Sequence, residues 1–230
     1  MPRPAACLFD LDGLLLDTEP CHGEAWRQAA LHFGLSLRDG QLLQLRGRRR
    51  VDCVTQVQRW IREAGHPVPT AEALLALQQP VARRLLPHAP AMPGARRLVE
   101  QCRELDVPMA MVTSSSRASM DLKVAPHGWL ESIALRILGD DPALLSGKPA
   151  PDPFLLACRR LGVAAAGCWA FEDSPAGARS AVAAGCLVHV LAPEGVGPSA
   201  YPAQVRWLRA LTEVRLERNE SCGEPISTGG

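Results

Sequence analysis

Lysine is nearly absent from this chain of 230 residues, because only Lys123 and Lys148 occur among its 25 lysine and arginine residues. Arginine takes almost every other basic position, most simply through a codon bias. A lysine that persists in such a chain is a candidate for a site where arginine will not serve. A surplus of charge is missing too: the formal net charge is +1, which argues against nucleic acid or an anionic membrane as a partner.

Long apolar runs and paired cysteine motifs are also missing. No run approaches the roughly 20 residues that span a bilayer, and Asp10 is reached before the core of a signal peptide could form. None of the eight cysteines belongs to a C-x-x-C pair or to a cluster with zinc-finger spacing. We therefore expect a cytoplasmic protein whose cysteines are mostly small buried side chains in a reducing compartment.

Short apolar runs alternate with helical patterns in most of the chain. The apolar runs cover 5–9, 107–112, 133–138, 168–171 and 186–191, and the helical patterns cover 94–105, 117–125, 153–162 and 176–185. This alternation predicts an α/β fold with a Rossmann-like, doubly wound parallel sheet. In such sheets ligands bind at the carboxyl ends of the strands, and Asp10, Thr113 and Glu172 each follow an apolar run.

Residues 14–90 interrupt the alternation. They contain helical patterns at 21–33, 50–64 and 71–86 and no clear strand, which predicts a helical cap inserted after the first strand. We expect a core made of 1–15 and 91–215, a helical cap at 16–90 and a flexible C-terminal tail at 216–230. Within the core, 201–211 is expected to form a closing helix.

Asp10 and Asp12 stand two residues apart, directly before Gly13. On a straight strand their side chains would point to opposite faces. A bend, which Gly13 permits, would turn both carboxylates toward one pocket. A turn that carries two solvated aspartates fits the same residues, so this motif alone leaves both readings open.

Further polar groups follow the later apolar runs, and each suits phosphate or metal chemistry. Thr113 offers a hydroxyl and the backbone amides that follow it, which suit a phosphate oxygen. Lys148 offers one compact ammonium ahead of a helical pattern. The adjacent Glu172 and Asp173 form a pair of hard oxygen ligands suited to Mg²⁺. The ordered set is much more specific than any one member.

In this order and spacing, the motifs resemble those of the haloacid dehalogenase superfamily of phosphotransferases. The resemblance covers about residues 5–193 and is carried by 9–19, 147–153 and 171–177, which are similar to the first, third and fourth motifs. More narrowly, the chain resembles the branch of this superfamily that carries a helical cap. That branch includes β-phosphoglucomutase and small sugar-phosphate phosphatases. The second motif is short, and its register falls at Thr113 or at Ser114.

The resemblance implies phosphoryl transfer with Mg²⁺ as the cofactor. Asp10 would be the nucleophile and a metal ligand. Asp12 would be the general acid and then the general base, and its backbone carbonyl would complete the metal shell. Asp173 would bind the metal directly, and Glu172 would be a further metal ligand or would hold the ligands in place. Because haloacid dehalogenases proper lack the second aspartate, Asp12 argues against dehalogenation.

The phosphoryl oxygens would be bound by Thr113, the Ser114 amide and Lys148. Lys148 thus falls where the family needs a point charge, and Lys148→Arg is expected to remove most of the activity. Lys123 falls in a predicted surface helix without an assigned role, and Lys123→Arg is expected to be nearly silent.

Three residues of the predicted cap are candidates for substrate contact, and each has a plainer interpretation. The resemblance places Glu19 at the substrate entry that this branch has; alternatively, Glu19 is a negative charge that the dipole of a helix favours at its N-terminus. His22 lies in a stretch similar to the His-x-x-Ala-Trp of β-phosphoglucomutases, or is a partly exposed helix histidine. Arg50 aligns with a basic residue that holds a distal phosphate, or belongs to the solvated basic run at 46–50.

The sequence favours a Mg²⁺-dependent phosphatase, with a small phosphorylated metabolite as its partner: a sugar phosphate, a bisphosphate or phosphoglycolate. Two alternatives stay open, a phosphomutase of the β-phosphoglucomutase type and a non-catalytic binding module. The stretch 114–117 reads Ser-Ser-Ser-Arg, without the lysine that follows the second motif in β-phosphoglucomutases, which disfavours the mutase. We expect a monomer.

Overall fold

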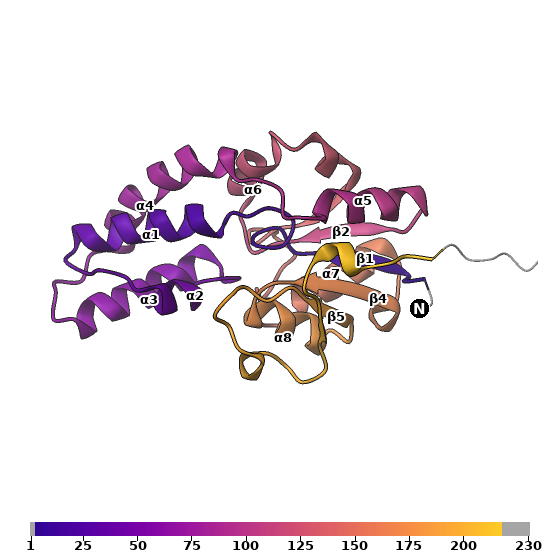
Figure 1. Cartoon of the computed structure of the whole chain (residues 1–230). Coiled ribbons are helices and arrows are strands. Elements are labelled where there is room, and N and C mark those ends of the chain that lie inside the picture. The colour runs from indigo at the N-terminus through magenta and orange to yellow at the C-terminus, as the bar shows by residue number, and fades with distance from the viewer. Residues whose placement is uncertain (1–2, 218–230) are drawn as a thin grey trace, which may run out of the picture.

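The computed structural model describes residues 3–217 and is built on one six-stranded sheet with the order β3-β2-β1-β4-β5-β6 (Figure 1). The strands are β1 (Ala6–Phe9), β2 (Met109–Val112), β3 (Leu135–Ile137), β4 (Cys168–Glu172), β5 (Leu187–Val190) and β6 (Arg206–Trp207). All neighbouring strands are parallel. Because β1 lies inside the sheet with later strands on both sides, the predicted doubly wound α/β fold is confirmed.

Helices cover both faces of the sheet. They are α5 (Ala95–Glu104) and α6 (Arg117–Val124) on one face, and α7 (Asp152–Leu161) and α8 (Pro175–Ala183) on the other. Cys7 and Phe9 pack toward the first pair, whereas Ala6 and Leu8 pack toward the second. Successive strand residues point to opposite faces, so a strand covered on both sides needs an unbroken apolar run. Residues 6–9 supply that run.

A separate group of helices lies to one side of the sheet, between β1 and α5 (Figure 1). They are α1 (Glu19–His32), α2 (Asp39–Leu43), α3 (Arg50–Glu63) and α4 (Ala71–Leu85). These helices bury their own apolar cluster, which includes Trp26, Val57, Ile61 and Leu74. The sequence predicted α1, α3 and α4 within two residues at each end. It missed α2, which is too short for a helical period to show.

The prediction of a closing helix at 201–211 is wrong. That stretch contains the edge strand β6, which pairs with β5 through His189–Arg206 and Val190–Trp207. The residue before a proline is disfavoured in the helical region, and Tyr201 precedes Pro202 in extended backbone. Of the predicted tail at 216–230, all but the first two residues lie outside the described residues. Within residues 3–217, no helix has both the length and the apolar character to cross a membrane.

Candidate active site

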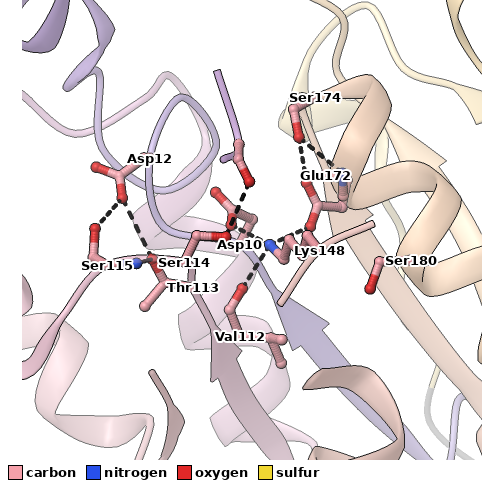
Figure 2. A network of polar contacts seen from close by, with 12 residues as sticks. Asp10, Asp12, Val112, Thr113, Ser114, Ser115, Lys148, Glu172, Ser174 and Ser180 are labelled. Carbon is pink, nitrogen blue, oxygen red and sulfur yellow. Dashed lines mark hydrogen bonds and ion pairs between the residues drawn. The ribbon is translucent and has the colours of Figure 1, made fainter. Parts of the chain in front are cut away.

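The predicted polar residues meet at the carboxyl ends of β1, β2 and β4. Asp10 follows β1, Thr113 follows β2, and Glu172 and Asp173 stand at the end of β4 (Figure 2). The chain winds in opposite directions on the two sides of β1, which is where doubly wound sheets open a crevice for ligands. The sheet therefore explains why residues far apart in the sequence share one site.

Three carboxylates form an acidic cluster, which consists of Asp10, Glu172 and Asp173. Each side chain is buried and offers an oxygen within 4.8 Å of the others. Burial raises the pKa of all three, and that of Glu172 rises to about 8. Both carboxylate oxygens of Asp173 are buried without a hydrogen-bond partner among the described residues. A buried carboxylate without donors is costly, so this cluster fits a bound cation.

Lys148 connects the acidic cluster to β2. Its Nζ lies 2.5 Å from Asp10 Oδ1, 2.5 Å from Glu172 Oε1 and 2.9 Å from the carbonyl oxygen of Val112 (Figure 2). These acceptors match the three N–H donors of an ammonium group. Although burial lowers the pKa of Lys148, the two carboxylates raise it above its ordinary value. Lys148 is therefore a buried, charged lysine beside Asp10.

Two glycines let backbone approach the acidic cluster. Gly13 has a φ of +82°, and a Cβ there would lie 2.3 Å from Asp173 Oδ2. A Cβ on Gly177, in the first turn of α8, would lie 2.0 Å from Glu172 Oε2. The Gly13 amide donates to the carbonyl of Leu16 at 2.8 Å, so the chain bends as predicted after Asp12. Only glycine combines this backbone conformation with such close contact.

Asp12 lies beside the acidic cluster in a cradle of its own donors. Thr18 Oγ1 donates to Asp12 Oδ1 at 2.6 Å, and His22 Nε2 lies 3.3 Å from the same oxygen. Ser115 Oγ donates to Oδ2 at 2.9 Å, and Thr113 Oγ1 lies 3.4 Å from it. Figure 2 shows the carboxylate turned toward Thr113 and Ser115. The two aspartates of the motif therefore have different surroundings.

Lys123 completes this cradle, and its predicted place on the surface is wrong. The side chain is 0% exposed, and its Nζ lies 2.6 and 2.7 Å from the two Asp12 oxygens and 2.6 Å from Ser115 Oγ. Burial alone would raise the pKa of Asp12, but the charge of Lys123 and a hydrogen bond with His22 hold it well below its ordinary value. The site thus holds both lysines of the described chain.

The predicted cap residues also reach the site. Glu19 forms an ion pair with Arg46 at 3.2 Å, and burial raises its pKa to about 8 although Arg46 opposes the shift. His22 contacts Asp12, and burial lowers the pKa of its imidazole. Arg50 begins α3 and lines the cavity above the acidic cluster. Burial and the neighbouring Arg83 lower the pKa of the Arg50 guanidinium.

The helical segment closes over the strand ends at the loop 46–50. Ser114 Oγ donates to the carbonyl of Gly47 at 3.0 Å, and a Cβ on Gly47 would lie 2.1 Å from Ser174 Oγ. The cavity there measures about 870 Å³, and its lining includes Asp10 and Asp12 from the core and Arg48, Arg49 and Arg50 from the basic loop. Carboxylates and a basic loop therefore line one space of small-molecule size.

A lysine and clustered carboxylates at the switch point of a doubly wound sheet form a candidate active site for phosphoryl chemistry. The chain belongs to the haloacid dehalogenase-like hydrolase family, whose family model matches residues 4–185. The expected family is therefore confirmed, and the chain is a phosphoric monoester hydrolase of that family.

Curated relatives agree with this assignment, and a solved structure shares the fold. The chain is 32% identical over 192 residues to (DL)-glycerol-3-phosphatase 2 of Arabidopsis thaliana, covering 81% of this chain and 78% of that protein. It is also 32% identical over 199 residues to fructose-1-phosphate phosphatase YqaB of Escherichia coli, covering 80% and 94%. A β-phosphoglucomutase from Clostridium difficile shares the fold with a TM-score of 0.77 at 18% identity, over 92% of this chain and 93% of that one.

Sequence reasoning missed Thr18, Ser115 and Lys123 as parts of the site. Thr18 lies inside the stretch that resembles the first motif, and Ser115 directly follows the second, but neither residue's contact with Asp12 could be read from the sequence. Lys123 had a signal of its own. It stands three residues after Met120 and next to Val124, on the face that an α6 helix buries.

Proposed function

We propose that the protein is a magnesium-dependent phosphatase that hydrolyses a small phosphorylated metabolite through an aspartyl phosphate on Asp10. One observation carries this proposal: Asp10 lies in contact with Lys148 and in the same cluster as Asp173, whose two buried oxygens have no donor among residues 3–217. A nucleophile, a cation for phosphoryl oxygens and ligands for a metal are thus combined at one cavity.

The acidic cluster would hold Mg²⁺, which prefers carboxylate oxygens. Asp10, Glu172 and Asp173 supply side-chain oxygens, and the backbone carbonyl of Asp12 is the further ligand that the family resemblance implies. When bound, the metal screens the repulsion between a carboxylate nucleophile and a phosphate ester. The orphaned oxygens of Asp173 support this fit.

Asp10 would attack the phosphorus of the substrate. A bond forms between the Asp10 carboxylate and phosphorus while the bond from phosphorus to the ester oxygen breaks. Lys148 is 2.5 Å from Asp10 and therefore reaches an oxygen of the group that Asp10 attacks. Thr113 and the Ser114 amide, at the end of β2, would bind the other phosphoryl oxygens as charge spreads over them.

Asp12 would move the protons, because it lines the same cavity as Asp10. The negative charge of a bound phosphate ester opposes the effect of Lys123 and raises the pKa of Asp12, so that Asp12 takes up a proton when the substrate binds. In the first step this carboxyl proton goes to the departing ester oxygen. In the second step a water oxygen bonds to phosphorus, the water proton goes to Asp12, and the bond between Asp10 and phosphorus breaks. The enzyme ends in its starting state, with alcohol and phosphate as products.

The cavity size favours a small substrate. A volume of about 870 Å³ accommodates a phosphorylated polyol or sugar, and glycerol-3-phosphatase and fructose-1-phosphate phosphatase are among the relatives. Glu19, His22 and Arg50 stand at the side of the cavity formed by the helical segment, so they would contact the part of the substrate beyond the phosphoryl group.

The test is phosphate release, with Mg²⁺ and with EDTA, from p-nitrophenyl phosphate, glycerol 3-phosphate, fructose 1-phosphate, phosphoglycolate and a sugar bisphosphate. Wild type should release phosphate only with Mg²⁺. Asp10→Asn should lose at least about 10⁴-fold in kcat, whereas the matched control Asp121→Asn, on the exposed side of α6, should match wild type. The proposal fails if wild type hydrolyses none of these esters, or if Asp10→Asn is as active as wild type.

Metal binding has a readout that does not need catalysis. Mg²⁺ should raise the Tm of wild type by about 2–5 °C, since a ligand that binds only the folded state stabilises it. Asp173→Asn should abolish that shift. In EDTA the same variant should be at least as stable as wild type, because it lacks an unpartnered buried carboxylate. If Mg²⁺ raised the Tm of Asp173→Asn as much as that of wild type, the assignment of the metal site would be contradicted.

The basic loop supports one alternative, a phosphomutase. Arg48, Arg49 and Arg50 line the same cavity as Asp10, and their guanidinium groups would bind the second phosphate of a bisphosphate intermediate. Glucose 1-phosphate separates the two activities: a phosphatase releases phosphate, whereas a mutase forms glucose 6-phosphate without net release.

A further inference from the structure

Lys123 is a buried cation for which the proposed reaction so far has no use. It comes from the last turn of α6, and its side chain is fully buried. Burying an ammonium without a counter-charge is strongly unfavourable. The chain has few lysines, and arginine is its ordinary cation. A lysine enclosed at the site therefore needs an explanation in terms of what its ammonium contacts.

All three N–H donors of the ammonium have acceptors. Two point to the two oxygens of Asp12, at 2.6 and 2.7 Å, and the third points to Ser115 Oγ at 2.6 Å. An ammonium has no further donor, so Lys123 has none left for a phosphoryl oxygen. Its contacts are with the carboxylate of Asp12 and with a hydroxyl that itself donates to that carboxylate. Lys123 therefore acts on Asp12 and not on the substrate.

The contact with both oxygens fixes the plane of the Asp12 carboxylate. A single hydrogen bond would leave the carboxylate free to rotate about its Cβ–Cγ bond, whereas one cation shared by two oxygens resists that rotation. Thr18 holds Oδ1 from the start of α1, and Ser115 holds Oδ2 from the loop after β2. The carboxylate is thus held from three separate segments of the fold.

The donors around Asp12 differ in what they can do when a proton arrives. The hydroxyls of Thr18 and Ser115 can turn from donors into acceptors and so accommodate a protonated oxygen. Lys123 is a donor only, so it binds whichever oxygen keeps a free lone pair and never competes for the proton. The ammonium keeps the group in place while the hydroxyls adjust.

We propose that Lys123 is a positioning residue for Asp12, which it holds in the orientation from which Asp12 passes a proton to the oxygen leaving phosphorus. This inference rests on the proposed function, in which Asp12 is the general acid. It adds a residue that the motif resemblance did not include. It also explains why a lysine persists here, since a guanidinium is larger than the fully enclosed space around Nζ.

The dependence on the leaving group tests this role. Alkyl phosphates such as glycerol 3-phosphate need a proton on the departing oxygen, whereas p-nitrophenolate leaves without one. Lys123→Met keeps the length of the side chain and removes the ammonium. Reactions with Mg²⁺ and with enzyme in excess over p-nitrophenyl phosphate report only the first transfer to Asp10. kcat/KM for glycerol 3-phosphate, or for the best alkyl ester of the panel, reports the step that needs the acid.

We expect Lys123→Met to lower kcat/KM for the alkyl phosphate by about 100-fold, and the single-turnover rate with p-nitrophenyl phosphate by less than threefold. Asp12→Asn should show the same selectivity, and the double variant should be no worse than Asp12→Asn alone. The control Arg96→Lys, on the exposed side of α5, should leave both rates at the wild-type value.

A purely structural role predicts a different pattern, because a smaller folded fraction lowers both rates by one common factor. Equal losses on the two esters, or unchanged kcat/KM for the alkyl phosphate, would overturn the role of Lys123. If Lys123→Met does not fold, Ser115→Ala replaces it: both charges stay, and a loss of about threefold to tenfold confined to the alkyl phosphate is expected. Equal activity of Ser115→Ala on both esters relative to wild type would then overturn the role. A wild type without turnover of either ester overturns the proposed function itself.

Discussion

The two lysines of the chain are both buried at the site, yet they hold carboxylates in different ways. Lys148 lies between Asp10 and Glu172 and also donates to the Val112 carbonyl, so it bridges the ends of three strands. Lys123 comes from a helix and gives two of its three donors to one carboxylate, that of Asp12. Each aspartate of the Asp-x-Asp motif therefore has its own ammonium.

The role of a buried charge therefore depends on the geometry of the acceptors around it. Lys148 touches the acidic cluster, where a phosphoryl group and a metal would both bind, so in the proposed reaction its partners would exchange. Lys123 contacts a group that needs a fixed orientation. Two identical side chains within one site thus suit phosphate binding and the positioning of an acid.

Substitution of Lys148 should have the largest effect. Lys148→Arg keeps the charge, but a guanidinium does not fit between Asp10 and Glu172 in this buried space, so kcat/KM should fall by about 100-fold or more. Lys148→Met should lose about 1,000-fold, because it also removes the charge. Steady-state kinetics with an alkyl phosphate measures both. Activity of Lys148→Arg within threefold of wild type would show that any cation suffices there.

The same reasoning reverses the expectation for the other lysine. Lys123→Arg, which the sequence predicted to be nearly silent, should now lose activity selectively on alkyl phosphates. Its matched comparison with Lys148→Arg separates the two roles, since Lys148→Arg should impair both classes of ester.

A third buried base, His189, extends the comparison because no carboxylate pairs with it in the described part of the chain. It stacks on Phe171 with ring centroids 5.0 Å apart, and burial, with a smaller effect of Arg206, lowers its pKa to about 4. The unfolded chain binds this proton below about pH 6.5. The folded protein therefore binds fewer protons between these values, and its stability falls as the pH drops from about 6.5 to 4.

Urea unfolding of wild type and His189→Phe at pH 7 and pH 4.5 measures this effect. Wild type should lose about 2 kcal/mol more than the variant over that interval. Lys148, in contrast, keeps its charge, because Asp10 and Glu172 outweigh the effect of burial and raise its pKa. Identical losses in the two proteins would mean that His189 accepts its proton without disturbing the fold.

Arg50 should show a smaller and more selective effect than either lysine. It lines the cavity beside Arg48 and Arg49, at the start of α3 in the helical segment. Arg50→Gln should raise KM for a bisphosphate by about tenfold, with a smaller change for a monophosphate, because its fork would bind a distal phosphate. Equal changes in KM for the two substrates would contradict the binding of a distal phosphate by Arg50.

The smallest effect should come from an exposed cation. Arg96 pairs with Glu100 on the surface of α5 at 2.8 Å, and its side chain is 68% exposed. Arg96→Lys should shift Tm by less than about 1 °C and leave kcat/KM unchanged, since exposed ion pairs contribute little. A large effect would show that arginine and lysine are not interchangeable even outside the buried site.

Much of the site was predictable because it lies where strands end. Asp10, Thr113 and Glu172 each follow an apolar run, and parallel strands bring their carboxyl ends to one edge. The contact of Ser114 with Gly47 was not predictable, because it depends on how the helical segment lies over the core. The structure of 201–211 was not predictable either, because the pairing of β6 with β5 outweighed the helical pattern of this stretch.

By itself, the sequence determined the parallel sheet, the strand-end carboxylates and Lys148, because apolar runs and the residues that follow them are local features. The contacts of Lys123, in contrast, depend on how the chain folds. Its partner Asp12 lies 111 residues away along the chain, and the helical period shows which residues share a face without showing what that face packs against. The face of α6 that carries Met120 and Val124 turns inward onto the sheet, and this packing brings the ammonium of Lys123 to the carboxylate.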